Sequence, residues 1–318
     1  MKVAKRDSGL RRGSTLIAVF WVMSILSLAV FTALRLLYFE IDLVTAQTHG
    51  SRARHLAEMG IAVAANPVVQ PDDPILYQEF EGGTESFQAE IRTEGGRFNI
   101  NLLLSPRPDT GEPDKALVRE ILGRWGMELD EASEVVDALV DWIDPNDLEE
   151  LNGAELDYYE ELGYLNRPYN RPFYSLDEVR LVRGWDVVER LNPDWQEWFT
   201  IWSSGPLDLN EAEPVLLAAA AEITEEEAQA VQDRVRGPDM VRFTEDDLPF
   251  ANAQEALDLL GLPDIQVELV LPRLSVNDPT VRIECIGRSG DVKRRVNMIM
   301  RNRDSRPTIL SRTEEVIP

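Results

Sequence analysis

An uncharged apolar segment near the N-terminus constrains this chain more than any other feature. Residues 14–34, STLIAVFWVMSILSLAVFTAL, contain no ionisable side chain, and they follow a basic segment, residues 1–13, with five Lys or Arg and one Asp. As an α-helix this run would rise about 31 Å, enough to cross a hydrocarbon layer of about 30 Å. Because basic residues remain on the cytoplasmic side, we expect the rest of the chain across the membrane.

The position of the small residue beside this segment distinguishes two kinds of leader. A secretory signal peptide carries its small-residue cleavage site after the apolar core, whereas here Arg35 and bulky residues follow and Gly13 precedes the core. This order resembles the leader of a type IV prepilin. The resemblance implies that a prepilin peptidase cleaves after Gly13 and that Ser14, the new N-terminus, is methylated. An uncleaved membrane anchor is the alternative.

One departure from the prepilin pattern concerns the fifth mature position. Most members of that family have Glu there, whereas this chain has Ala18. In the family, the Glu carboxylate pairs with the N-terminal amine of a neighbouring subunit. The resemblance therefore implies a subunit with no neighbour above it.

Helical periodicity continues beyond the apolar segment and ends at Asn66-Pro67. We therefore expect one helix of about 50 residues, spanning residues 14–66, whose outer half forms an assembly stalk. Small residues along the stalk would permit close approach of two partner stalks, and they are Ala46, Gly50, Ala53, Ala57 and Gly60.

The remaining chain alternates between strand-like and helical regions. Residues 86–93 and 97–102 resemble two strands joined by a turn, and residues 280–286 and 293–300 resemble a hairpin. Between them, six helices are expected, namely Asp114–Trp125, Asp130–Ile143, Ser175–Val182, Glu211–Ala221, Thr224–Val235 and Asn252–Leu260. Asp130, Ser175 with Glu178, and Thr224 with Glu227 are expected N-caps.

This order predicts an α+β fold in which both strand pairs share one small antiparallel sheet. The expected domains are a leader (1–13), a membrane and stalk helix (14–66), the first part of a pilin-like domain (67–105), an all-helical insertion (106–269), and C-terminal strands with a tail (270–318). The insertion is divided into units of about 106–205 and 206–269.

Charge and cysteine content exclude several classes of function. The net charge of −25 opposes binding to nucleic-acid phosphates, and the single cysteine excludes an intramolecular disulfide. Cys285 lies in an alternating apolar stretch and is expected to be buried. The two histidines, His49 and His55, lie on the stalk, and no nucleophile, phosphate-loop or zinc motif is present. We therefore expect neither an enzyme nor a small-molecule substrate.

The densest polar segment is the loop from Asp141 to Tyr159, DWIDPNDLEELNGAELDYY. Its carboxylates and amides suit calcium, which binds six to eight oxygen ligands on flexible backbone. The spacing differs from that of an EF-hand. From the residues alone, a calcium site and a solvated acidic loop remain alternatives.

Several motifs together resemble general secretion pathway protein K, the large minor pseudopilin of type II secretion. They are the leader without Glu, GRFNIN, the Asp141–Tyr159 loop, Asn166–Pro172, the segment LDLNEAEPVLLAA and the terminal hairpin. The resemblance implies a cap on the pseudopilus, minor pseudopilins I and J as partners, and a single-pass bacterial inner-membrane protein with a cytoplasmic N-terminus and a periplasmic bulk. It also implies calcium in the insertion. The expected ligands are Asp144, Asp147, Glu155 and Asp157, with Asp141 and Asn170 as further candidates.

Residues 210–234 are similar to the helix-hairpin-helix units of DNA-uptake proteins, and the insertion is expected to have that SAM-like helical architecture. Such units approach phosphate through a glycine-rich hairpin. Here the hairpin, residues 221–227, has no glycine and four Glu. We therefore interpret it as a packing module without nucleic acid. The alternative function is a minor pilin of a DNA-uptake or type IV pilus system.

Overall fold

The structure, a computed structural model, describes residues 10–80, 82–108 and 110–317, with side chains from Thr15 onward. The helices are α1 (Leu10–Ala64), α2 (Ile100–Leu104), α3 (Lys115–Arg124), α4 (Leu129–Ile143), α5 (Leu156–Glu161), α6 (Leu176–Val179), α7 (Trp185–Leu191), α8 (Pro214–Ala221), α9 (Glu225–Val235), α10 (Ala253–Leu260) and α11 (Asp264–Val270). The strands are β1 (Tyr77–Glu79), β2 (Glu85–Thr93), β3 (Phe98–Asn99), β4 (Phe199–Thr200), β5 (Leu207–Asp208), β6 (Leu274–Ser275), β7 (Thr280–Ser289), β8 (Val292–Arg301) and β9 (Thr308–Ile317). Short 3₁₀ turns lie at Pro74–Leu76, Trp195–Glu197 and Leu271–Arg273.

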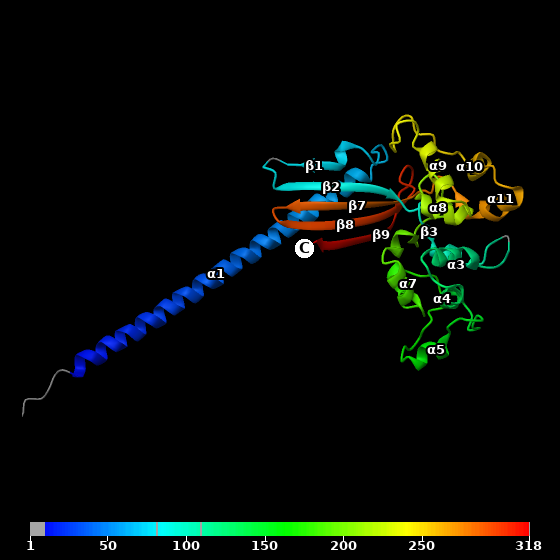
Figure 1. Ribbon diagram of the computed structural model, residues 1–318. Coiled ribbons are helices and arrows are strands. Elements are labelled where there is room, and N and C mark those ends of the chain that lie inside the picture. The colour runs from blue at the N-terminus through cyan, green and yellow to red at the C-terminus, as the bar shows by residue number, and fades with distance from the viewer. Residues whose placement is uncertain (1–9, 81, 109, 318) are drawn as a thin grey trace, which may run out of the picture.

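A five-stranded antiparallel sheet unites the two ends of the chain. Its order is β1-β2-β7-β8-β9, and β2 pairs with β7 from Glu85 opposite Ser289 to Thr93 opposite Val281. The described residues between β2 and β7 form a separate, mostly helical domain at one end of the sheet (Figure 1). The expected α+β class is confirmed, and strands from both ends of the chain share this sheet as expected, although one of the four expected strands does not join it.

The two outer strands of this sheet were not expected from the sequence. Strand β9 is mostly exposed and does not alternate between apolar and polar residues, so it lacks the usual strand pattern. Ion pairs attach it to the long helix, with Arg312 2.7 Å from Glu58 and Glu314 3.3 Å from Arg54. Strand β1 has only three residues, all exposed.

The expected strand at residues 97–102 is wrong. Only Phe98–Asn99 is extended, and it pairs in parallel with β4 in the helical domain instead of forming a hairpin with β2. The Asn99 side chain then accepts hydrogen bonds from the backbone N–H of Asn101 and Leu102, which caps helix α2. The chain therefore leaves the large sheet at Glu94.

Helix α1 lies across one face of the sheet, and its second half forms a core with β2, β7 and β8. Buried side chains of this core include Ala57, Ile61, Phe87, Ile283 and Cys285. Cys285 is buried as expected, and burial raises the pKa of its thiol to about 12. A second core holds the helical domain together, and its buried side chains in the described part of the chain lie between Phe98 and Leu274.

The expected N-caps have mixed outcomes. Thr224 and Glu227 form the complete capping box of α9. Asp130 is not a cap, because α4 begins one residue earlier and Asp130 lies in its first turn. Ser175 precedes α6 without a side-chain bond, because the Glu178 carboxylate instead accepts from Trp142 and Arg171.

A buried carboxylate joins the sheet to the helical domain. Glu94, which follows β2, is fully buried and accepts from Arg97 at 2.6 Å, from Arg282 of β7 at 2.7 Å and from the Thr200 hydroxyl of β4. Arg301 of β8 also donates to the carbonyl of Trp202 at 2.8 Å. These charge-assisted bonds hold both domains in one orientation.

Candidate functional site

The first half of α1 exposes apolar side chains along its length. Of the residues described, α1 alone is long and apolar enough to cross a membrane, and large apolar residues from Leu16 to Val44 are exposed. This fits a single-pass anchor. The backbone at Gly13 and Ser14 is helical, whereas residues 1–9 and the side chains of residues 10–14 lie outside the description. Cleavage and methylation at this point stay predictions.

The stripe of small residues on the stalk packs mostly against the chain's own sheet, whereas a partner stalk was expected there. Gly50, Ala53, Ala57 and Gly60 are buried against the chain's own sheet, and only Ala46 is exposed. A Cβ added at Gly60 would lie 2.3 Å from the Cys285 sulfur, and one added at Gly287 would lie 2.0 Å from the Ala53 carbonyl oxygen. These glycines let the helix approach β7, so this stripe cannot receive a partner stalk.

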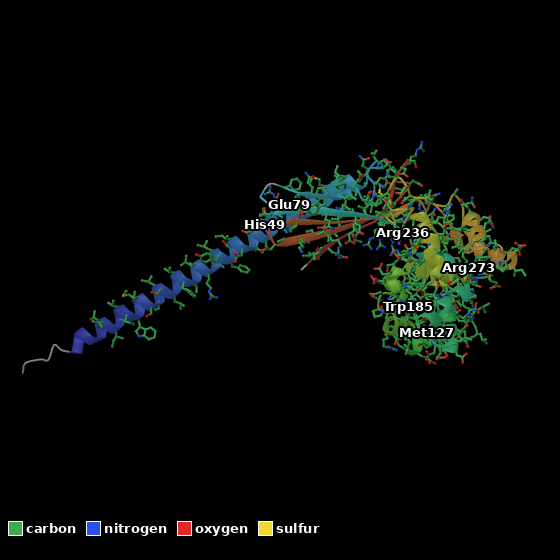
Figure 2. The ribbon with its side chains drawn as sticks, turned by 45° about the horizontal axis from the view of Figure 1, so that its top comes forward. His49, Glu79, Met127, Trp185, Arg236 and Arg273 are labelled. Carbon is green, nitrogen blue, oxygen red and sulfur yellow. The ribbon has the colours of Figure 1, made fainter. Side chains whose placement is uncertain are left out.

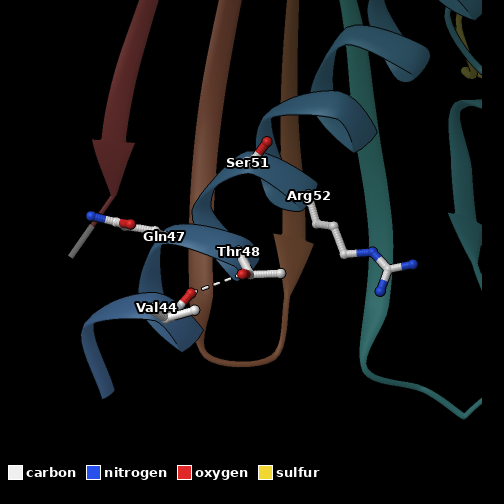
Figure 3. Close-up of a pocket in the computed structure, with 5 residues that line it drawn as sticks. All are labelled: Val44, Gln47, Thr48, Ser51 and Arg52. Carbon is white, nitrogen blue, oxygen red and sulfur yellow. Dashed lines mark hydrogen bonds between the residues drawn. The ribbon is translucent and has the colours of Figure 1, made fainter. Parts of the chain in front are cut away.

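A shallow cavity of about 430 Å³ lies on α1 near the membrane-proximal end of the sheet (Figure 3). Its lining residues are Val44, Gln47, Thr48, Ser51 and Arg52. The first four are spaced i, i+3, i+4 and i+7, which is the set that receives a knob side chain in a coiled coil. Arg52 is held beside Glu85 at 3.1 Å.

Helix α4 positions the acidic loop. Its apolar residues bury one face in the domain core, and Pro145 ends it after Ile143 because proline lacks an amide N–H. Asp137 and Asp141 lie one turn apart on this helix and are both buried. Their carboxylates therefore point to the side where the loop returns.

The loop is anchored through these two carboxylates. Asp141 accepts from the backbone N–H of Glu150 at 3.0 Å and of Ala154 at 2.7 Å. Asp137 accepts from the backbone N–H of Asn152 at 3.2 Å and from Lys115 at 3.0 Å. Burial raises the pKa of Asp141 to about 6, even though the backbone bonds act in the opposite direction.

Glu155 is a buried carboxylate that lacks a hydrogen-bond partner among the described residues. It is 7% exposed, and neither oxygen has a hydrogen-bond partner within the described part of the chain. Burial, followed by the charges of Asp141, Asp144 and Asp147, raises the pKa of Glu155 to about 7. Burial likewise raises the pKa of Asp144. An ionised carboxylate in such surroundings is unfavourable without a cation.

Asn170 supplies a second unpartnered oxygen. Its backbone has φ 48°, a left-handed conformation that asparagine tolerates. Its amide nitrogen donates to Asp147 at 2.9 Å and to the Asn146 carbonyl at 3.3 Å. Its amide oxygen is buried and has no partner among the described residues.

Five of the six expected ligands interact with one another. The charges of Asp141, Asp144 and Asp147 act on Glu155, and Asn170 donates a hydrogen bond to Asp147. The sixth, Asp157, has no such interaction among the described residues. Asp157 is exposed in the first turn of α5. Across the described ranges, no three carboxylate, imidazole or thiol groups already converge on one point. The available donors are all oxygens, including an amide, which fits calcium better than zinc.

Sequence reasoning missed the residues that support the loop. Asp137 precedes Asp141 by four residues, and this helical spacing could have indicated their common face. Trp142 is fully buried among Tyr159, Tyr169 and Phe173, and its ring N–H donates to Glu178 at 3.1 Å. Arg183 donates to the Gly153 carbonyl at 2.8 Å. Such long-range partners leave no local signal.

The helical hairpin of α8 and α9 contains an unusual turn. Glu222, which ends α8, has φ 54°, a conformation that glycine adopts more easily. Its carboxylate lies 2.8 Å from Arg273, which is buried and also pairs with Asp114 at 2.8 Å. Figure 2 shows Arg273 within the helical domain. This ion pair gives Glu222 a role in packing.

Most tryptophans of the helical domain pack in its core, and both histidines lie on the stalk helix. Trp195 is fully buried, and Trp198 packs edge-on against Trp125 at 5.2 Å between ring centroids. His55 is exposed and forms a surface pair with Glu58 at 3.4 Å. His49 lies 2.8 Å from the Ser289 hydroxyl at the membrane-proximal end of the sheet (Figure 2).

Comparison with known proteins relates this chain to a protein family and to a solved structure. Residues 96–193 match the family described as type II secretion system (T2SS), protein K. The fold resembles the crystal structure of the GspK-GspI-GspJ complex from the type 2 secretion system of enterotoxigenic Escherichia coli, with a TM-score of 0.63 and 15% identity. That match covers 88% of this chain and 99% of the other. No protein of curated function matches in sequence.

The family match and the structural match differ in the part of the chain they cover and in the conclusion they support. At 15% identity, the structural likeness is one of fold, and it covers nearly the whole chain. The family match lies in the segment from β3 to α7, which includes the acidic loop. Together they confirm the resemblance to protein K that the motifs indicate.

Proposed function

We propose that this chain, a minor pseudopilin of the protein K type, caps the tip of a type II secretion pseudopilus. In this role it takes part in starting pseudopilus assembly and so serves the export of folded proteins across the outer membrane. We assign it no catalytic reaction. The observation that carries the proposal is the position of the helical domain at the end of the sheet remote from the start of α1 (Figure 1). A subunit stacked above would meet this domain.

Minor pseudopilins I and J are the proposed partners, because the similar crystal structure is of GspK in complex with GspI and GspJ. A partner stalk cannot use the small-residue stripe, which the chain's own sheet covers. The cavity at Val44, Gln47, Thr48 and Ser51 supports docking of that stalk on a different face of α1 (Figure 3).

Processing and location follow from the same assignment. We propose cleavage by prepilin peptidase after Gly13, methylation at Ser14 and insertion of α1 in the inner membrane with the bulk of the chain in the periplasm. Mass spectrometry of the N-terminal peptide tests the first two steps. A chain that retains residues 1–13 would contradict them.

We also propose a calcium ion in the acidic loop. Asp144, Asp147, Glu155 and the Asn170 amide oxygen would hold it, and Asp141 would orient the loop. When bound, the ion would supply positive charge that lowers the repulsion among these carboxylates. The two unpartnered oxygens of Glu155 and that of Asn170 are the support for this assignment.

Calorimetric titration of the full-length chain with calcium tests this site. Asp144→Ala/Asp147→Ala should abolish the binding heat, and Glu155→Gln should weaken affinity by about tenfold or more. Glu225→Ala/Glu226→Ala removes two exposed carboxylates from α9 and should leave binding unchanged. Equal binding by all four proteins, or none in the wild type, would contradict the assignment.

Immunogold labelling of pseudopili tests the capping role. An antibody against the helical domain should label one end of each pseudopilus. Labelling along the length would place this subunit among the repeating ones and reject the cap. The alternative, a pilin for DNA uptake, is disfavoured because residues 106–269 hold 40 of the 57 Asp and Glu but only 12 of the 32 Lys and Arg.

A further inference from the structure

Large apolar side chains are exposed where the acidic loop meets the segment after α5. Leu148 and Leu151 of the loop are 79% and 91% exposed, and Leu165 is 72% exposed. Tyr164 and Tyr169 are also exposed. We refer to these five residues as the tip surface. Single exposed leucines are common on proteins, but several such residues in one region indicate an interaction site.

Hydrogen bonds bring the two segments together. Asn170 donates to Asp147, next to Leu148, and to the carbonyl of Asn146. The adjacent Tyr169 packs its ring against buried Trp142 at 5.2 Å between centroids. The tip surface is therefore fixed on the domain core at both segments, which lowers the entropy cost of binding.

Arginine side chains hold the tyrosines in place. The guanidinium of Arg167 lies 4.4 Å from the centre of the Tyr164 ring, and that of Arg171 lies 4.9 Å from the Tyr169 ring. Tyrosine and arginine are enriched at protein interfaces, where rigid aromatic side chains supply contact area. The composition of this region thus matches a protein-binding surface.

The charge around the tip surface selects the partner. Residues 141–171 contain nine Asp and Glu and two Arg, Arg167 and Arg171. Four exposed carboxylates lie outside the proposed calcium site, and they are Glu149, Asp157, Glu160 and Glu161. This excess of carboxylates would repel an anionic lipid surface and would attract cationic side chains at the rim of an interface. An acidic rim around exposed leucines is complementary to apolar side chains flanked by Lys and Arg.

We propose that the tip surface is a docking site for a protein segment that presents apolar side chains flanked by Lys and Arg. The leucines and tyrosines would contact the apolar residues, and the surrounding carboxylates would contact the cations. This interaction is separate from stalk packing and from calcium binding, because none of its five contact residues contributes an oxygen to the calcium site. It adds a second contact to the proposed cap.

Binding of a synthetic amphipathic helix of Leu and Lys to the full-length chain tests the proposal. The chain is held in nanodiscs of zwitterionic lipid, and fluorescence anisotropy of the labelled peptide is measured. Leu148→Ser/Leu151→Ser should weaken affinity by about tenfold or more. Raising the salt concentration from about 50 mM to about 500 mM should weaken wild-type binding because it screens the carboxylates.

Controls separate this surface from general adhesion. Leu259→Ser/Ile265→Ser removes two exposed apolar residues elsewhere on the domain and should bind as the wild type does. An analogous peptide of Leu and Glu should not bind. Equal loss in both double variants, equal binding of the acidic peptide, or equal binding to empty nanodiscs would each overturn the proposal. So would the absence of saturable binding.

Discussion

A Cβ added to Gly153 would lie 1.8 Å from Oδ2 of Asp141, the oxygen that accepts the hydrogen bond from Ala154. The loop thus passes α4 so closely that only glycine fits at this point. Since the same loop carries Glu155, any displacement at Gly153 changes the position of that carboxylate.

Gly153→Ala should therefore lower calcium affinity by about tenfold or more, because the loop must move away from Asp141. Calorimetric titration measures the affinity. Gly123→Ala is the matched control, since a Cβ at this exposed position in α3 meets no atom within 4 Å. The control should bind calcium normally and gain roughly 0.5–1 kcal/mol of stability. Unchanged calcium affinity in Gly153→Ala would show that the position of the loop at Gly153 does not affect calcium binding.

The raised pKa of Glu155 predicts how stability depends on pH in the absence of calcium. In the folded chain this pKa is about 7, against an ordinary value of 4.5, so the folded state retains a proton that the unfolded state releases. The free energy of unfolding should therefore fall as pH rises from about 4.5 to about 7.

Denaturant unfolding at several pH values, with a chelator present, measures this dependence. Glu155→Gln should have a flatter profile, with a residual slope from Asp141, whose pKa is raised to about 6. Saturating calcium should reduce the slope in the wild type. Identical profiles for wild type and Glu155→Gln would show that Glu155 does not titrate in this range.

The contact between Gly60 and Cys285 predicts the effect of a methyl group at the stalk. Gly60→Ala should destabilise the chain by about 1–3 kcal/mol, because the new Cβ would also lie 2.7 Å from the Phe87 ring. Denaturant unfolding measures the loss, and Cys285→Ala in the same chain should restore part of it. Gly205→Ala, where a Cβ meets no atom within 4 Å, should have little effect. Equal effects at the two glycines would argue against close packing.

The Arg273 side chain is buried and forms ion pairs, so removing it should lower the free energy of unfolding. Arg273 is 7% exposed and bonds to Asp114, the N-cap of α3, and to Glu222. Arg273→Ala should cost about 3 kcal/mol, because buried Asp114 would lose both of its bonds to Arg273 and keep, among the described residues, only the ion pair with Arg107 at 3.1 Å.

Arg190→Ala breaks an exposed ion pair with Asp186 and should cost less than about 1 kcal/mol. Comparing the unfolding free energies of the two variants checks the difference. Similar costs would indicate that the existing bond from Arg107, at 3.1 Å, is enough to compensate the charge of Asp114.

Local signals made several parts of this fold predictable. The apolar run gave the long helix, the alternation in residues 280–300 gave β7 and β8, and Thr224 with Glu227 gave the cap of α9. Each depends on residues close together in the sequence. The acidic loop was also predictable as a cluster, since its carboxylates follow one another along the chain.

The remaining features depend on contacts between distant residues. Strand β9 forms because β8 offers it a partner edge, although its own residues are mostly polar and exposed. Phe98 leaves the expected hairpin because Phe199 pairs with it. The small stalk residues face β7, and their spacing alone could not distinguish a sheet from a partner helix. Likewise, only the tertiary fold determines that the Glu155 carboxylate is buried without a hydrogen-bond partner among the described residues.

The insertion of the helical domain between paired strands also imposes an order on biosynthesis. Strand β2 leaves the ribosome before the whole helical domain, and its partner β7 emerges only after it. In the described part of the chain, the buried side chains of that domain's core lie between Phe98 and Leu274, so the core can be completed while the sheet is still open. A nascent chain must therefore keep the β7-facing edge of β2 unpaired for most of its translation, and the sheet closes only when the last strands arrive.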